Sequence, residues 1–208
     1  SSAIPDHAHA VAGNVTEISI DGFSTTNSWQ GYYGNVTGVI QLANSAKQVM
    51  YNWSQLNPTG EIYSSRNGTV AWSYVQCFNY TADGTLASDI AQAGNTSYYG
   101  LNLTGLEELY NITSSDSDGV NETFTLTGAG GHSEFYTGSL LFEAGECNGM
   151  KVFNSTGVGD FHEALLYEPN GRSVIFTSIL KSDANGFDSK THDFEMLVLE
   201  NGHGTDTF

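Results

Sequence analysis

Basic residues are scarce in this sequence. Six lysines and arginines stand against 23 aspartates and glutamates, which gives a formal net charge of −17. Nucleic acids and anionic membrane surfaces are bound through clustered positive charge, so the composition argues against both as partners. The acidic surplus has two interpretations: it keeps the chain soluble in salty or crowded surroundings, or it takes up cations, including Ca²⁺ at contacts between subunits.

Long apolar runs are also lacking. No stretch reaches the 18 consecutive apolar residues that would suggest a membrane-spanning helix. The sequence therefore predicts no membrane span. It begins at Ser1 rather than at a methionine, which fits the removal of a signal peptide and fits equally a sequence cut from a longer chain.

Cysteine is limited to Cys77 and Cys147. One pair suits a single disulfide in an oxidising compartment, and the alternative is two buried free thiols. A disulfide that closes a loop of about 70 residues contributes roughly 4 kcal/mol in the chain-entropy model. The glycosylation signal described next favours the disulfide.

Acceptor motifs for N-linked glycans are abundant. About a fifth of the residues are Ser or Thr, so chance predicts roughly three or four Asn-X-Ser/Thr motifs. The sequence has ten, which indicates a secreted, heavily glycosylated protein with an extracellular or cell-surface location. The ten acceptors are Asn14, Asn35, Asn52, Asn67, Asn79, Asn95, Asn102, Asn111, Asn121 and Asn154.

The stretch from Trp29 to Asn67 predicts a three-stranded meander. Apolar and polar residues alternate over 36–42 and again over 48–53, and 61–65 supplies the third strand. Asn57-Pro58-Thr59-Gly60 is a strong turn signal before that strand, because proline presets φ and glycine permits a positive φ.

The rest of the chain predicts further short strands and very little helix. Thr69–Cys77 is aromatic and is expected to be central, and 172–180 is nearly all apolar and is expected to be a buried central strand. Helical turns are expected only at 86–93 and 104–109. The other expected strands are 14–20, 121–127, 134–136, 140–143, 151–154, 161–168 and 192–200.

About a dozen short strands separated by Gly, Asn and Ser turns predict an all-β fold, an antiparallel β-sandwich of jelly-roll type. No linker divides the chain, so residues 14–208 are expected to form one domain. Residues 1–13 are too rich in small residues to form a core element, and from His7 they alternate. Such an arm could donate a strand to a neighbouring subunit, or it could be a disordered terminus.

Two loops resemble parts of Ca²⁺ sites, because hard cations need closely spaced oxygen ligands on a tight turn. The first has Asp116, Asp118 and Asn121 around Gly119, and the second has Asp183, Asn185 and Asp188 around Gly186. Neither has the full twelve-residue pattern, and both sequences also occur in ordinary β-turns. Calcium is therefore a candidate ligand, and no cofactor is required.

Acidic and histidine residues at 132, 134, 160, 162 and 163 could be arranged on paper as a catalytic site. Acid–base catalysis needs such groups together in a pocket, but His162 and Glu163 are adjacent on an expected strand and point to opposite faces. The sequence also lacks a nucleophile elbow and an H-E-x-x-H motif. We therefore expect a protein that is not an enzyme and has no catalytic residues.

Four segments, W-Q-G-Y-Y-G-N-V-T-G-V-I, Y-N-W-S, G-E-I-Y-S-S-R and D-F-E-M-L-V-L-E, resemble segments of secreted surface proteins of archaea. The acceptor density and acidity are similar to those of archaeal S-layer, sheath and filament subunits. The resemblance implies a structural role outside the cell, with copies of the same chain as partners. The expected function is a structural subunit of an extracellular assembly, and the alternative is a Ca²⁺-dependent carbohydrate-binding or adhesion module.

Overall fold

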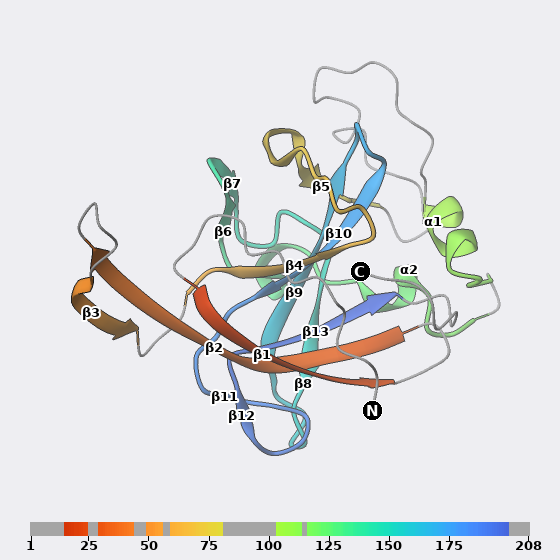
Figure 1. Cartoon of the computed structure of the whole chain (residues 1–208). Coiled ribbons are helices and arrows are strands. Elements are labelled where there is room, and N and C mark those ends of the chain that lie inside the picture. Colours follow the sequence, from red (N-terminus) through yellow and green to blue (C-terminus); the bar gives the residue numbers. More distant parts are fainter. Residues whose placement is uncertain are drawn as a thin grey trace.

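A computed structural model describes residues 15–24, 29–43, 49–55, 59–80, 103–113 and 116–199. These residues form mainly antiparallel strands in two larger sheets and two small hairpins (Figure 1). The expected all-β sandwich is confirmed. Among the described residues, no helix has the length and apolar character needed to cross a membrane.

The first sheet is built around the long strand β2 (Trp29–Ala43). One edge of β2 pairs with β1 (Val15–Ser24), and the other pairs with β13 (Phe194–Leu199) and then with β3 (Val49–Gln55). Gly34 lies where β2 runs between its two neighbours, and a Cβ atom there would collide with the Ser19 carbonyl oxygen. The end of β2 and β3 form a hairpin that extends away from the two sheets (Figure 1).

The second sheet has the order β4–β10–β9–β5, and β8 also pairs with β9. Its strands are β4 (Glu61–Ser65), β5 (Gln76–Cys77), β8 (Gly149–Phe153), β9 (Gly159–Glu168) and β10 (Ser173–Ile179). All but the last residue of β10 are buried, as expected for the apolar run at 172–180.

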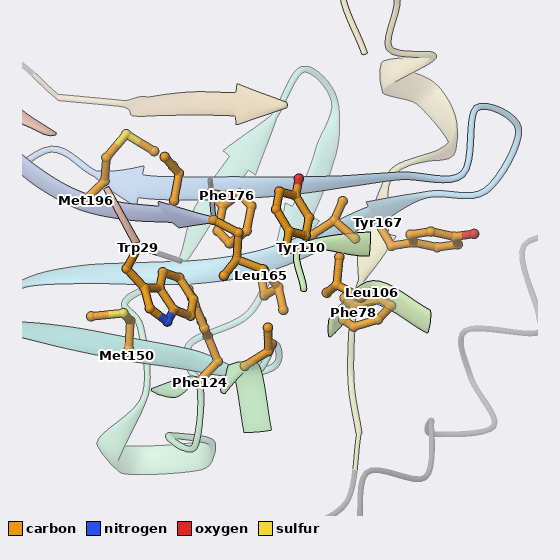
Figure 2. Close-up of a cluster of buried hydrophobic side chains, with 14 of the residues drawn as sticks. Trp29, Phe78, Leu106, Tyr110, Phe124, Met150, Leu165, Tyr167, Phe176 and Met196 are labelled. Carbon is orange, nitrogen blue, oxygen red and sulfur yellow. The ribbon is translucent and has the colours of Figure 1, made fainter. Parts of the chain in front are cut away.

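The core lies between the two sheets and beneath the helices α1 (Leu103–Leu109) and α2 (Val120–Thr123). Trp29 on β2 is buried against the rings of Phe124 and Phe176, with centroids 6.0 and 6.3 Å away. Figure 2 shows these side chains together with Leu165 and Met196. Burial of large apolar side chains from both sheets stabilises the sandwich.

Two small hairpins flank the sheets. The first pairs β6 (Phe135–Thr137) with β7 (Leu140–Phe142), and the second pairs β11 (Ala184–Asn185) with β12 (Thr191–His192). Phe135 and Phe142 stack in the first hairpin and belong to a second buried cluster around the cysteines.

Three expectations about strands are wrong. Residues 61–65 do form a strand, but β4 pairs with β10 in the second sheet and not with β3, so the meander has two strands rather than three. Thr69–Cys77 is not a central strand: it holds a 3₁₀ turn at Trp72–Tyr74 and the two-residue strand β5 at the sheet edge. The first error concerns the partner of β4, which lies about a hundred residues away and beyond the reach of local patterns. The second is an error of local structure, since only the last two residues of 69–77 form a strand.

The third wrong strand is 121–127, where the structure has helix α2. The backbone N–H groups of Val120 and Asn121 donate to the Glu107 carboxylate on α1. The first N–H groups of α2, which have no acceptor within their own helix, therefore find one on α1. Phe124 is buried as expected. The expected helical turn at 104–109 is confirmed by α1, and the one at 86–93 lies outside the described residues.

Candidate functional site

The candidate site is the outer edge of β1. In the part of the chain that the structure describes, β1 pairs only with β2, through a register that runs from Val15 to Ser24. The side chains of Ser19 and Asp21 are exposed, while Ile20 packs against the core. An antiparallel edge of this kind presents backbone N–H and C=O groups that can pair with another extended segment.

On the opposite edge of the first sheet, the outer side of β13 is bonded to other parts of the molecule. The outward backbone groups of β13 and of the residue before it bond to the second sheet and its flanking chain. The Leu197 N–H donates to Glu163 Oε2 at 2.8 Å, and the Ser178 hydroxyl donates to the Glu195 carbonyl at 2.8 Å. The Lys181 N–H donates to the Asp193 carbonyl at 2.9 Å. Within the described residues, the β13 edge of the first sheet is therefore bonded to the rest of the molecule, while β1 and the strand β3 of the protruding hairpin each pair only with β2.

Glu163 is the most deeply buried of the side chains that bond to the outer side of β13. Its side chain is fully buried on β9, and its second oxygen, Oε1, has no hydrogen-bond partner among the described residues. Burial raises the pKa of the Glu163 carboxyl well above its usual range, although the bond from Leu197 acts in the opposite direction. The sequence signal for this role is a single charged residue inside the apolar run of residues 161–167.

The disulfide joins Cys77 on β5 to Cys147, as expected from the sequence, with a Cα–Cα distance of 4.9 Å. The Cys147 N–H donates to His132 Nε2 at 3.0 Å, so the ring proton is on Nδ1 and donates to the Ser133 carbonyl at 2.8 Å. Burial lowers the pKa of His132, which favours this neutral ring. The disulfide is a structural link in the fold, and it fits an oxidising compartment.

The glycan acceptors differ in how their amide groups are used. A glycan is attached to the side-chain nitrogen of asparagine. At Asn154 the side-chain oxygen accepts three bonds, from the Thr156 N–H, the Thr156 hydroxyl and the Val158 N–H, and the nitrogen takes no part in them. At Asn79 both ends are used: the nitrogen donates to the Glu146 carbonyl and the oxygen accepts the Asn148 N–H.

The remaining acceptors also fall into groups. Asn35 and Asn111 are exposed, whereas Asn67 and Asn121 are partly buried. Asn52 is on β3, but its side chain lies outside the described part of the structure. Asn14, Asn95 and Asn102 lie outside the described residues, as do residues 1–13. Occupancy of every acceptor stays a prediction.

The first candidate Ca²⁺ loop uses its polar groups for the fold. The Asp116 carboxylate accepts bonds from the Thr113 N–H and hydroxyl, at 2.7 and 3.0 Å. The Asp118 backbone carbonyl accepts the indole N–H of Trp29. The bonds to Asp116 lie within the loop, and the bond from Trp29 connects the loop to the core.

The second candidate loop joins β11 to β12. The Asp188 carboxylate lies 2.8 Å from His192 Nε2 and 3.5 Å from Lys190 Nζ. The Asp183 N–H donates to the Asp193 carboxylate. Across the described ranges of the chain, no three His, Cys, Asp or Glu side chains are grouped so that they could hold a metal ion. Metal binding by Asp116, Asp118, Asp183, Asn185 or Asp188 stays a prediction.

The residues considered for catalysis have separate surroundings. Asp160 forms an ion pair with Lys181 at 2.6 Å, His132 supports the disulfide, and Glu163 faces β13. Burial lowers the pKa of His162, and the nearby charge of Lys151 adds to that effect. Glu134 is exposed.

Comparison of the chain with models of protein families, with curated proteins and with solved structures finds no match.

Proposed function

We propose that this chain is a secreted, N-glycosylated structural subunit that assembles with copies of itself into an extracellular filament, sheath or S-layer. The observation that carries the proposal is the asymmetry of the first sheet. Its β13 edge is bonded to the second sheet, whereas within the described residues β1 pairs only with β2. A ten-residue strand at a sheet edge is a template for strand addition.

The proposed donor is the segment of residues 1–13, which directly precedes β1 in the sequence. Its alternating small residues, Ala8, Ala10 and Ala12, suit a strand that lies flat against a neighbouring sheet. The arm of one subunit would pair with the β1 edge of the next. Because the donor and acceptor belong to different copies, this contact propagates into an open chain of subunits.

The acceptor sites support an extracellular setting. Asn35 and Asn111 are exposed, and the nitrogen of Asn154 lies outside the bonds that hold its side chain. Glycans at such positions would shield the surface that assembly does not use. The acidic surplus then keeps unassembled subunits apart, because like charges repel.

The test is deletion of residues 1–13, which leaves β1 intact. The expected result is a folded monomer, by circular dichroism and light scattering, under conditions in which the full chain forms polymers. A synthetic peptide of residues 1–13 should bind the deleted protein and cap growth of the full chain. A matched peptide with Ala8→Pro and Ala10→Pro should do neither, because proline lacks the N–H that strand pairing needs.

Two results would contradict the proposal in different ways. Normal polymers from the deleted protein would remove the arm from the mechanism and leave the subunit function standing. A glycosylated full chain that stays monomeric at every concentration and salt would refute the subunit function itself.

A further inference from the structure

The two arginines of the chain line the same hollow. Arg66 follows β4 and Arg172 precedes β10, and the hollow between them has a volume of about 360 Å³. Its walls are residues 65–67, residues 171–174 and the last turn of α1. Ligand pockets in proteins begin at about 300 Å³, so this one suits a ligand the size of a single sugar ring.

This hollow concentrates a charge that is rare in the molecule. The chain has only six lysines and arginines. Lys181 and Lys190 are in ion pairs with Asp160 and Asp188. Two of the six cations therefore stand at the wall of this hollow, beside the turn that the Glu168 carboxylate holds.

The local structure holds the side chain of Arg66 and the backbone of Arg172. The Arg66 guanidinium lies over the ring of Tyr110, 5.4 Å from its centroid, a cation–π contact that holds it beside α1. Arg172 has a φ of 52°, in the left-handed region, at the end of the turn after Glu168. The Glu168 carboxylate accepts the N–H groups of Asn170 and Gly171, both at 2.7 Å, and this shapes the turn.

The surroundings favour a carboxylate over a phosphate. Protein phosphate sites commonly use backbone N–H groups at a helix N-terminus, but here the helix presents its C-terminal end, which carries partial negative charge. The N–H groups of the neighbouring turn are already bonded to Glu168. A ligand with one negative charge therefore fits better than one with two, and the planar guanidinium fork matches a carboxylate.

The rest of the wall suits a sugar. Ser65, Asn67 and Ser173 bring polar side chains to the wall. The oxygens of Ser65 and Asn67 also accept backbone N–H groups, and the Ser173 hydroxyl donates to the Gly171 carbonyl. Leu109, which is half exposed, offers an apolar surface for the C–H face of a ring. We propose that the hollow binds a hexuronic acid, with Arg66 and Arg172 on its carboxylate. The assignment goes beyond the assembly function and does not depend on it.

The test is calorimetric titration of the protein with glucuronate, with glucose as the neutral match and inorganic phosphate as the competing anion. The protein carries Thr69→Ala, which removes the acceptor motif at Asn67. That change keeps the bond from the backbone N–H of residue 69 to Asn67 Oδ1. Glucuronate is expected to bind saturably, with a Kd of about 1 mM or below, and glucose is not.

Variants locate the site. Arg66→Gln and Arg172→Gln should each weaken glucuronate binding by about tenfold or more, as expected for loss of a charge-assisted bond. Lys190→Gln, which removes a cation elsewhere, should leave the affinity unchanged. Circular dichroism checks that each variant is folded, and Arg66 is exposed, so its substitution is not expected to disturb the core.

Four results would overturn the proposal: equal binding of glucose, tighter binding of phosphate, full affinity in a folded Arg66→Gln, Arg172→Gln double variant, or no saturable binding of glucuronate. None of these results bears on whether the chain assembles.

Discussion

Substitution of Glu163 tests how the two sheets are joined. Glu163→Ala would leave the Leu197 N–H buried without its acceptor, which costs about 1–3 kcal/mol. It would also leave a cavity where a fully buried side chain had been, so the total loss is expected to be about 3 kcal/mol, within the range for large-to-small core changes. For a domain of this size, that loss lowers Tm by about 6–12 °C.

Glu163→Gln distinguishes the effect of the ionisable group on stability from the effect of the side chain's size and hydrogen bond. It keeps an oxygen that can accept the Leu197 N–H and removes the ionisable group. Because burial raises the folded-state pKa of Glu163, the stability that the proton provides is fully present below the unfolded pKa of about 4.3 and is lost as the pH rises through the folded pKa. The wild-type protein should therefore become less stable relative to Glu163→Gln as the pH increases over that window.

The assay is urea unfolding followed by tryptophan fluorescence, at several pH values between about 4 and 8. Glu134→Gln is the matched control, since it removes one negative charge from an exposed position. If Glu163→Ala is as stable as the wild type, or if the stability difference between wild type and Glu163→Gln does not vary with pH, the reasoning about the β13 edge is refuted.

Three further predictions concern the disulfide and the acceptors. Replacing Cys77 and Cys147 with alanine should lower the free energy of unfolding by about 4 kcal/mol, and an unchanged urea midpoint would contradict this. Asn79→Ala removes two bonds to the backbone beside Cys147 and should cost about 1–3 kcal/mol; equal stability would show that these bonds are dispensable. Thr156→Ala should reduce the mass of the native protein by one glycan at Asn154, and an unchanged mass would show that this acceptor is not used.

Local patterns predicted many of the strands but not their partners. The alternation of 36–42 and 48–53 identified β2 and β3, which pair through a short connection. The run at 172–180 identified β10 as buried, since apolar character on both faces indicates cover on both sides. β4 was found at its observed bounds, yet its pairing with β10 depends on the path of the intervening chain, which no local pattern specifies.

The strand at the candidate site was expected at 14–20 and is observed as β1 at Val15–Ser24, but its place at the edge of the sheet was not predicted. Two cysteines in a sequence rich in glycan acceptors indicated the disulfide. Sequence reasoning did not identify His132 as the acceptor for Cys147, the role of Glu163 at β13, or the meeting of Arg66 with Arg172. Each of these joins residues that are distant in sequence, so only the fold reveals it. For the arginines, the available signal was their rarity in an acidic chain.

The most direct test of the central claim is electron microscopy of the protein isolated from its native source without denaturant. The account predicts regular filaments, tubes or lattices, in which a strand from a neighbouring subunit lies along the outer edge of β1. Dispersed single particles, or an ordered assembly in which β1 touches no neighbour, would contradict it.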